Sequence, residues 1–197
     1  MAAIPLPGRE NGTTASGIFR AAWNRRALFL EFEITDNKFV HVEYEKPGAR
    51  WNNDCVQLYI DTLADGRNKK ARKFDENDYS YALFPASDGK SIRFYRVRSV
   101  DGQLALGNST PQNNTFADDI PVEFILRNGK LIYRTAIPAK YLLPLKLEVN
   151  RSFGLGLFIP DCDEPEKRTG SLSTVIDGDV KKQNQPVHFP HLVLSLD

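Results

Sequence analysis

The stretch Trp51-Asn-Asn-Asp-Cys-Val-Gln-Leu-Tyr-Ile-Asp61 is the part of the sequence that decides the fold. In its second half the apolar residues Val56, Leu58 and Ile60 alternate with more polar ones such as Gln57. Successive side chains of a strand point to opposite faces, so the three apolar residues share one side. This alternation predicts a strand that buries one face in a core.

The same stretch places an aromatic ring and a polar amide near each other, because Trp51 lies six positions before Gln57. A sugar ring has an apolar C–H face that packs on an indole, and hydroxyl groups that each need a hydrogen-bond partner. The combination favours a saccharide-binding surface. Two ordinary interpretations stay open beside it: Trp51 as a packing residue, and Gln57 as an exposed strand residue.

Composition excludes several classes of function. The chain has 197 residues, which fits one domain, and 41% of them are hydrophobic, which is enough for a core. Its 26 Lys and Arg residues balance 25 Asp and Glu residues, so we expect no nucleic acid as a partner. No apolar run approaches the roughly 20 residues of a membrane span, and residues 1–5 lack the features of a signal peptide. A mature or excised domain behind an added methionine remains compatible with a secreted origin.

Strand signals run along the whole chain. Asn128-Gly129 separates two strand-like segments and is a strong hairpin signal, because a type I′ turn needs positive φ at both positions. Long connections are expected at 37–50, 64–77 and 160–185, and Leu192, Leu194 and Leu196 are expected to face inward. The expected strands are 18–23, 27–35, 54–61, 79–84, 91–97, 122–127, 131–137, 153–159 and 187–196, with one short helix at 139–143.

Many strands with turn residues between them and almost no helix predict an all-β fold. We expect an antiparallel two-sheet β-sandwich of jelly-roll or immunoglobulin-like type, with one short helix. Neither a repeat nor an internal boundary is visible, so residues 1–197 are expected to form a single domain.

Other chemistry-bearing residues indicate no catalytic or zinc motif. Cys55 and Cys162 are too few for a disulfide scaffold, and we expect two partly buried thiols, with a single bridge as the alternative. His188 and His191 would point to opposite faces of a strand, and His41 has no evident partner, so zinc is not expected. No Gly-x-Ser-x-Gly motif exists, and no motif singles out a carboxylate pair for glycoside hydrolysis. We therefore expect no enzyme activity of this chain alone.

Six segments, in this order, resemble the family 9 carbohydrate-binding modules and their relatives, which are often attached to polysaccharide-degrading enzymes. These segments are Phe19-Arg-Ala-Ala-Trp23, Ala27-Leu-Phe-Leu-Glu-Phe-Glu-Ile-Thr-Asp36, the stretch from Trp51 to Asp61, Tyr133-Arg-Thr-Ala-Ile-Pro138, Phe153-Gly-Leu-Gly-Leu-Phe-Ile-Pro-Asp-Cys-Asp163 and Phe189-Pro-His-Leu-Val-Leu194. The resemblance covers nearly the whole chain and rests on the order and spacing of these motifs. It implies a two-sheet β-sandwich and non-catalytic binding of a mono- or oligosaccharide.

The resemblance also implies roles for single residues. Founding members hold a reducing-end sugar between two tryptophans, grip its hydroxyls with polar side chains, and bind structural calcium. By position, Trp51 matches one of the two tryptophans, and Gln57 matches a hydroxyl-binding carboxylate, here an amide. Asp161, Asp163 and Arg168 fall in the loop that flanks the site.

The chain departs from the family where the second tryptophan should stand, shortly before the last strand. Lys181-Lys-Gln-Asn-Gln-Pro-Val-His188 contains none, and the nearby His188 and Phe189 are expected on the strand. By analogy with aromatic burial, losing one ring costs about 1–3 kcal/mol, which is about tenfold to over a hundredfold in affinity. We therefore expect weak binding, in about the micromolar to millimolar range.

Further residues complete the expected site. Tyr81 shares a strand face with Tyr79 and is expected to extend the groove, while Trp23 is expected in the core. Asp54 is expected to cap the entry into its strand, with ligand or metal contact as the alternative. The complete expected ligand-binding set is Trp51, Gln57, Tyr81, Asp54, Asp161, Asp163 and Arg168.

Calcium is the cofactor that the resemblance implies. The acidic residues Asp161, Asp163, Glu164 and Glu166 could supply oxygen ligands, with a solvated acidic loop as the alternative. The same two alternatives apply to Asp36, Asp61 and Asp65. Neither haem nor a nucleotide is expected; the only methionine is Met1, which leaves no Met–His haem ligation.

Two further implications concern the biological context. The family resemblance implies a linked catalytic domain such as a glycoside hydrolase, and a secreted, periplasmic or cell-surface location. The alternative function is a structural or protein-interaction module of a larger glycan-active protein, in which the sugar site is degenerate.

Overall fold

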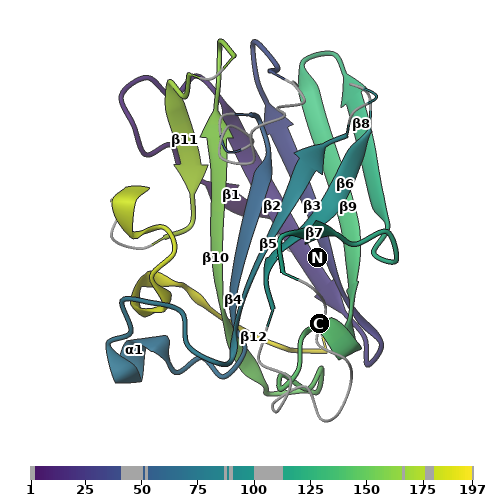
Figure 1. The fold of residues 1–197 in the computed structure, drawn as a ribbon, viewed down its shortest axis with the longest axis vertical. Helices are drawn as coiled ribbons and strands as arrows, with labels where there is room; N and C mark the ends of the chain where they lie inside the picture. Colours follow the sequence, from purple (N-terminus) through teal and green to yellow (C-terminus); the bar gives the residue numbers. More distant parts are fainter. Residues whose placement is uncertain are drawn as a thin grey trace.

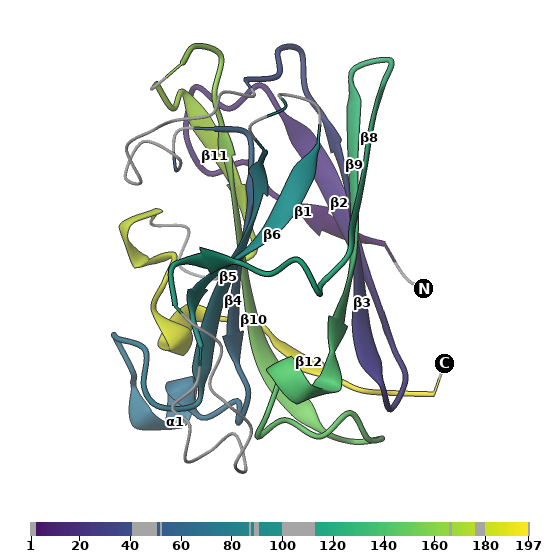
Figure 2. The same ribbon diagram turned by 45° about the vertical axis from the view of Figure 1, so that its right-hand side comes forward.

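The computed structural model describes residues 3–40, 51, 53–86, 88, 91–99, 113–165, 167–175 and 180–196. Among the residues discussed above, Met1, His41 and Glu166 lie outside these ranges. Two antiparallel sheets pack face to face, as Figures 1 and 2 show from two directions. The predicted β-sandwich is confirmed.

The first sheet has the order β1-β2-β3-β9-β8, and the second has the order β11-β10-β4-β5-β6-β7 with β12 paired to β10. The strands of the first sheet are β1 (Ile4–Leu6), β2 (Ser16–Trp23), β3 (Ala27–Thr35), β9 (Lys130–Pro138) and β8 (Val122–Arg127). Those of the second are β11 (Gly170–Ser173), β10 (Ser152–Asp161), β4 (Val56–Asp61), β5 (Asp78–Pro85), β6 (Ile92–Arg98), β7 (Thr115–Phe116) and β12 (His191–Val193). The short helices are α1 (Gly66–Lys69), η2 (Ala139–Tyr141), η3 (Val180–Lys182) and η4 (Pro186–His188).

The main core lies between the sheets and is built by the alternating residues. Val56, Leu58 and Ile60 of β4 are buried there, and the apolar side chains of β3 meet them from the other sheet. The β8–β9 hairpin turns at Asn128 and Gly129, whose φ angles of 53° and 71° are the positive values that the sequence predicts. Local turn chemistry and strand periodicity therefore give the same register.

The two outer faces of the sandwich differ in character. The first sheet carries an exposed ion-pair network in which Glu31 accepts from Arg20 and Arg134, at 2.7 Å each. The second sheet buries its outer face as well, since Cys55 and Tyr59 are 0% and 5% exposed. Strand β4 is thus buried on both sides, and this second outer face is the more unusual feature of the molecule.

Four sequence expectations are corrected by the fold. The expected closing strand 187–196 is shorter, because η4 replaces its beginning and Leu196 is exposed rather than inward. The expected loop at 160–185 contains the edge strand β11 and the helix η3, and the expected loop at 64–77 contains helix α1. The short helix expected at 139–143 is the 3₁₀ turn η2.

Two further findings concern the cysteines and the helices. Cys55 and Cys162 are free and buried, as the first of the two alternatives predicted. None of the helices in the described ranges is long and apolar enough to cross a membrane.

Candidate functional site

Gln57 lies in the middle of the outer face of the second sheet. It pairs with Phe158 on β10 and with Ala82 on β5. Cross-strand partners point to the same side of a sheet, so these three side chains form one row across it. Gln57 Oε1 accepts a hydrogen bond of 2.6 Å from the Tyr59 hydroxyl, while the only partner of its Nε2 among the described residues is the Cys55 Sγ at 3.9 Å. The amide is oriented by the sheet and is 3% exposed.

Trp51 stands at one end of this row. Its ring meets Phe84 edge to face at a centroid distance of 5.0 Å, and it packs on the cluster that Cys55, Ala82, Phe84 and Tyr95 form. The tryptophan remains half-buried, whereas Phe84 beneath it is 1% exposed. A buried aromatic support therefore holds a partly accessible indole on this face. This is the arrangement that stacking on a sugar requires.

Arg168 stands at the other end of the row. Its guanidinium lies 5.4 Å from the centroid of the Phe158 ring, and it contacts Glu10 Oε1 at 3.3 Å. Asp163 belongs to the same β10–β11 loop and accepts a hydrogen bond of 3.0 Å from Thr169 Oγ1. The structure therefore brings Trp51, Gln57 and Arg168 to one face, with Asp163 on the flanking loop; their ligand-binding role stays a prediction.

Tyr81 does not belong to this face. It lies between the sheets and is 1% exposed; its hydroxyl donates to the Tyr141 carbonyl at 2.7 Å, and its ring stacks on Tyr79 at 5.3 Å. The expectation that Tyr79 and Tyr81 extend a ligand groove is therefore corrected. The alternate residues of β5, Ala82 and Phe84, are the ones that face outward.

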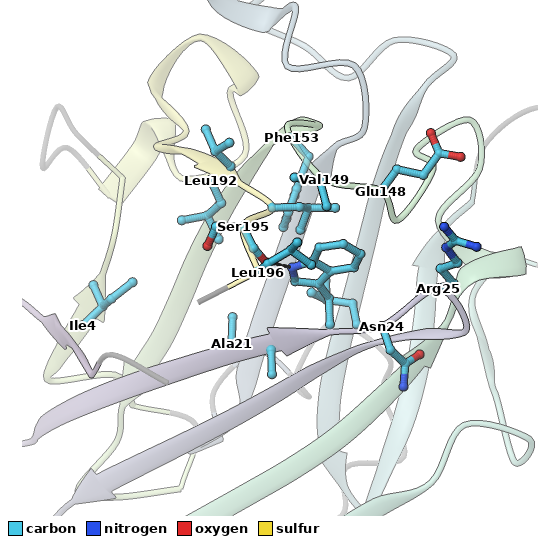
Figure 3. A pocket seen from close by; sticks show the side chains of 15 residues that line it. Ile4, Ala21, Asn24, Arg25, Glu148, Val149, Phe153, Leu192, Ser195 and Leu196 are labelled. Atoms are coloured by element: carbon cyan, nitrogen blue, oxygen red, sulfur yellow. Dashed lines mark hydrogen bonds between the residues drawn. The ribbon is translucent and has the colours of Figure 1, made fainter.

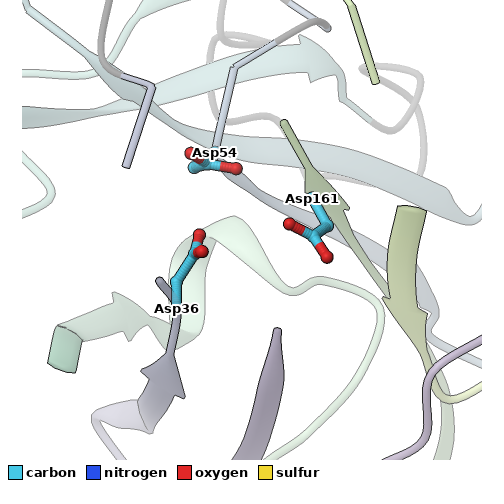
Figure 4. Close-up of side chains that lie close together, drawn as sticks. All are labelled: Asp36, Asp54 and Asp161. Carbon is cyan, nitrogen blue, oxygen red and sulfur yellow. The ribbon is translucent and has the colours of Figure 1, made fainter. Parts of the chain in front are cut away.

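Three buried carboxylates meet at the end of the sandwich where β4 begins. Asp36 follows β3, Asp54 precedes β4, and Asp161 ends β10, so the group joins both sheets (Figure 4). One oxygen from each carboxylate lies within 4.8 Å of the other two. Three carboxyl groups so close together, from three distant parts of the chain, disfavour the charged form of one another and favour either a bound proton or a bound cation.

Backbone amides hold these carboxylates in place. Asp54 accepts from the Val40 amide at 2.5 Å and from the Cys162 amide at 2.9 Å, while Asp161 Oδ2 accepts from the Thr14 and Ala15 amides at 2.6 and 2.9 Å. Burial outweighs these bonds and raises the pKa of Asp54 to about 8. Burial also raises the pKa of Asp36, and the charges of Asp161 and Asp163 add to this effect.

The donor set of this group fits a calcium ion. Calcium takes six to eight oxygen ligands, and carboxylates are its usual charged ones. Within the described ranges, no lysine or arginine forms an ion pair with Asp36, Asp54 or Asp161, so their charge is not balanced by a side chain. A bound cation would supply that balance.

The acidic residues that the sequence suggested as calcium ligands do not all belong to this carboxylate group. Of the described residues Asp161, Asp163 and Glu164, only Asp161 belongs to the carboxylate group; Glu164 pairs with Lys167 at 3.4 Å, and Glu166 lies outside the described residues. Asp61 instead accepts from the backbone amides of residues 63, 65 and 66 and so holds the turn into α1. Asp65 pairs with Lys69 at 2.9 Å.

Comparison with known proteins identifies the family. A family model described as carbohydrate family 9 binding domain-like matches residues 6–195. The chain belongs to this family.

Solved structures share its fold at low sequence identity. A carbohydrate-binding module of family 9 from Caldicellulosiruptor kristjanssonii in complex with glucose aligns with TM-score 0.70 and 14% identity, over 98% of this chain and 84% of that one. The same organism's family 9 module in complex with cellotriose gives 0.72 and 13%, over 98% and 82%. A putative carbohydrate-binding protein from Bacteroides uniformis gives 0.62 and 12%, over 99% and 87%. A search of curated proteins returned no significant match.

In this family 9 domain, the segment that should carry a second ring offers none to a ligand. Phe189 follows η4 instead of lying on a strand, and it is fully buried against Tyr59 at a centroid distance of 6.0 Å. Gly156 makes room for it, since a Cβ there would lie 2.7 Å from the Phe189 ring. Phe189 thus completes the buried outer face, and Trp51 has no aromatic counterpart among the described residues of this segment.

A separate concavity surrounds Trp23 at the edge of the sandwich (Figure 3). The indole packs against the core but is only half-buried, and its Nε1 donates to the Ser195 carbonyl at 2.8 Å. The cavity of about 900 Å³ also has Asn24, Arg25 and Glu148 on its wall. Sequence reasoning placed Trp23 wholly in the core and missed this cavity, because the C-terminal residues that line it are remote in sequence.

Proposed function

We propose that this family 9 domain binds a saccharide on the outer face of its second sheet, with Trp51 as the stacking platform. The observation that carries the proposal is the half-buried indole held edge-on by Phe84, with Gln57 and Arg168 in a row beside it. Arg168 is the hydrogen-bond donor with accessible surface, because its side chain is 33% exposed. Gln57 has an amide hydrogen free for a hydroxyl once a ligand reaches the floor of the face.

Neutral glucose-based oligosaccharides are the first ligands to test, because two similar structures hold glucose and cellotriose. One ring platform without a second gives weak affinity, in about the micromolar to millimolar range. A linked polysaccharide-degrading enzyme and a location outside the cytoplasm are part of the proposal, since a weak binding domain is useful when it holds a catalytic partner near its polymer.

We propose further that Asp36, Asp54 and Asp161 hold a calcium ion. A calcium ion would supply positive charge, and its coordination by the three carboxylates would link β3, β4 and β10. Support comes from the proximity of the three oxygens and from the absence of a basic partner within the described residues. In this role the cation is structural and does not contact the sugar face.

A second function is favoured by one specific observation. Gln57 is 3% exposed, so the floor of the face is covered and only its rim is accessible. A degenerate sugar site would have this appearance, and the domain would then act as a structural or protein-interaction module.

Titration calorimetry of the whole chain distinguishes the two functions. Wild type, Trp51→Ala and Trp23→Ala would be titrated with glucose, cellobiose and cellotriose, with calcium and with a chelator. Saturable heat that is lost in Trp51→Ala and kept in Trp23→Ala supports the proposed site. Loss in Trp23→Ala alone would move the site to the edge cavity, and no heat from any of the three saccharides with an intact circular dichroism spectrum favours the interaction module.

A further inference from the structure

A second concavity lies at the opposite end of β4 from Trp51. Trp51 precedes β4, whereas helix α1 follows it, and α1 packs against η4 at that far end (Figure 1). A cavity of about 510 Å³ lies between the segment that follows α1 and the segment that contains the ends of η3 and η4. Its lining residues within the described ranges are Lys70, Arg72, Lys182, Gln185, Val187 and His188, and none of these is acidic.

The fold brings together two basic segments that are more than a hundred residues apart. Residues 67–73, Arg-Asn-Lys-Lys-Ala-Arg-Lys, contain five basic residues in seven positions, and Lys181-Lys182 follows much later. The Val187 amide donates to the Ala71 carbonyl at 3.1 Å, which fixes the two segments side by side. The whole chain has a net charge of only +1, so this positive charge is local.

Four of the five basic residues of the first segment divide into two groups. Arg67 donates to the Phe189 carbonyl at 3.1 Å, and Lys69 pairs with Asp65 and Asp75 at 2.9 and 2.7 Å. These contacts hold the loop and use the neighbouring carboxylates. Lys70 and Arg72, in contrast, make no side-chain hydrogen bond or ion pair with any residue of the described ranges, and both line the cavity.

The backbone at Lys70 has an uncommon conformation. It adopts a left-handed conformation with φ of 51°, and its amide donates to the Arg67 carbonyl at 3.2 Å. The chain therefore turns sharply after α1. Lys70 and Arg72 lie at and after this turn, on the side of η4. A guanidinium binds a carboxylate or sulfate through two parallel hydrogen bonds, and an ammonium adds a point charge.

We propose that this cavity binds the anionic group of an acidic saccharide, a uronate carboxylate or a sulfate ester. The proposal rests on the proposed function only in its choice of a saccharide as the carrier of the anion. Arg72 holds the anion in a bidentate manner and Lys70 neutralises it, while the Gln185 amide offers a donor and an acceptor for an adjacent hydroxyl. The site is separate from the Trp51 face, so the two can bind different parts of a heterogeneous polymer.

The test uses the whole chain and the double variant Lys70→Gln/Arg72→Gln. The matched control is Lys73→Gln, an exposed cation of the same segment that does not line the cavity. The probes are trigalacturonate, a sulfated disaccharide, cellotriose and inorganic sulfate, titrated at low and at high salt. Charge-assisted hydrogen bonds predict that the double variant loses about tenfold or more in affinity for the acidic saccharides, with cellotriose binding unchanged. High salt should weaken the acidic ligands only.

Other outcomes have a definite meaning. Equal affinity of wild type and double variant for acidic saccharides overturns the proposal, and so does an equal loss in Lys73→Gln, which would indicate general charge attraction. If inorganic sulfate or a single-stranded oligonucleotide binds as tightly as the acidic saccharides, the ligand class is wrong. A further outcome is that wild type and Trp51→Ala both show no binding of cellotriose while acidic saccharides still bind through Lys70 and Arg72. That result would contradict the proposed Trp51 site and support the present inference.

Discussion

Asp54 makes the stability of the calcium-free protein depend on pH in an unusual direction. Burial raises its pKa from 3.8 to about 8, and burial raises that of Asp78 from 3.8 to about 7. The folded form therefore keeps these protons at pH values where the unfolded chain has lost them. The stabilising contribution of these two carboxyl groups is fully present below their unfolded pKa, near pH 4. It is lost as the pH rises to their folded pKa values of about 7 to 8.

The size of the effect follows from the pKa difference. One pKa unit corresponds to about 1.4 kcal/mol, so Asp54 alone lowers the stability at pH 7 by about 4 kcal/mol relative to pH values below about 4, and by nearly as much if its folded pKa is one unit lower. That is a large share of the roughly 5–15 kcal/mol by which a domain is stable. His191, whose pKa burial lowers from 6.5, acts in the opposite direction, but it is exposed at the sheet edge.

Calcium should reverse this pH dependence. Ligand carboxylates bind the ion only when deprotonated, so calcium stabilises the fold more as the pH rises. At a hundred times its dissociation constant it contributes about 2.7 kcal/mol. Asp54→Asn removes the titrating charge and one ligand, and should flatten both the pH response and the calcium response.

Thermal unfolding followed by circular dichroism at several pH values, with calcium and with a chelator, measures both effects. Asp118→Asn serves as the control, because this carboxylate is exposed and lies outside the group. Calcium-free stability that increases between pH 5 and 8 would refute the reasoning about burial. A calcium shift of full size in Asp54→Asn would refute the assignment of the site.

Three further predictions test the fold. Leu58→Ala should cost about 2–5 kcal/mol in urea unfolding, because the side chain is fully buried between the sheets; a loss below 1 kcal/mol would contradict its place in the core. Gly129→Ala should destabilise the domain by about 1 kcal/mol, since φ at this position is 71°, whereas an unchanged urea midpoint would argue against the type I′ turn. Cys55 and Cys162 should react with a thiol reagent only as fast as the protein unfolds, because burial raises both pKa values; rapid reaction in native buffer would show an accessible thiolate.

The strands of this domain were predictable where one face only is apolar. Residues 27–35 and 122–127 match β3 and β8 in both bounds, and the hairpin at Asn128 was located by its turn residues. Hydrophobic periodicity did not predict which face of β5 meets the core, because Tyr81 on one face and Phe84 on the other are both buried. A strand buried on both faces carries no signal that says which face meets the core.

The prediction of a closing strand over residues 187–196 was wrong for a different reason. Leu192, Leu194 and Leu196 alternate as in a strand, but prolines at 186 and 190 restrict the backbone before it, and only residues 191–193 pair with β10. Strand β11 was missed because Gly170-Ser-Leu-Ser173 has little β-propensity. Its pairing with β10 gives it a structure that its local sequence does not specify.

The carboxylate group and the sugar face, although they do not touch, are joined through the backbone. Asp54 lies three residues after Trp51, and it accepts from the amide of Cys162, where the loop that carries Arg168 begins. The two ends of the proposed saccharide row therefore depend on one carboxylate that burial keeps protonated near neutral pH unless a cation binds. Coupling between two binding sites is reciprocal, so if the proposed calcium ordered both segments, it would strengthen saccharide binding by the same factor by which saccharide would strengthen calcium binding. If the proposed calcium and saccharide both bind, the position of Asp54 predicts that the cation sets the affinity of this face without contacting the sugar.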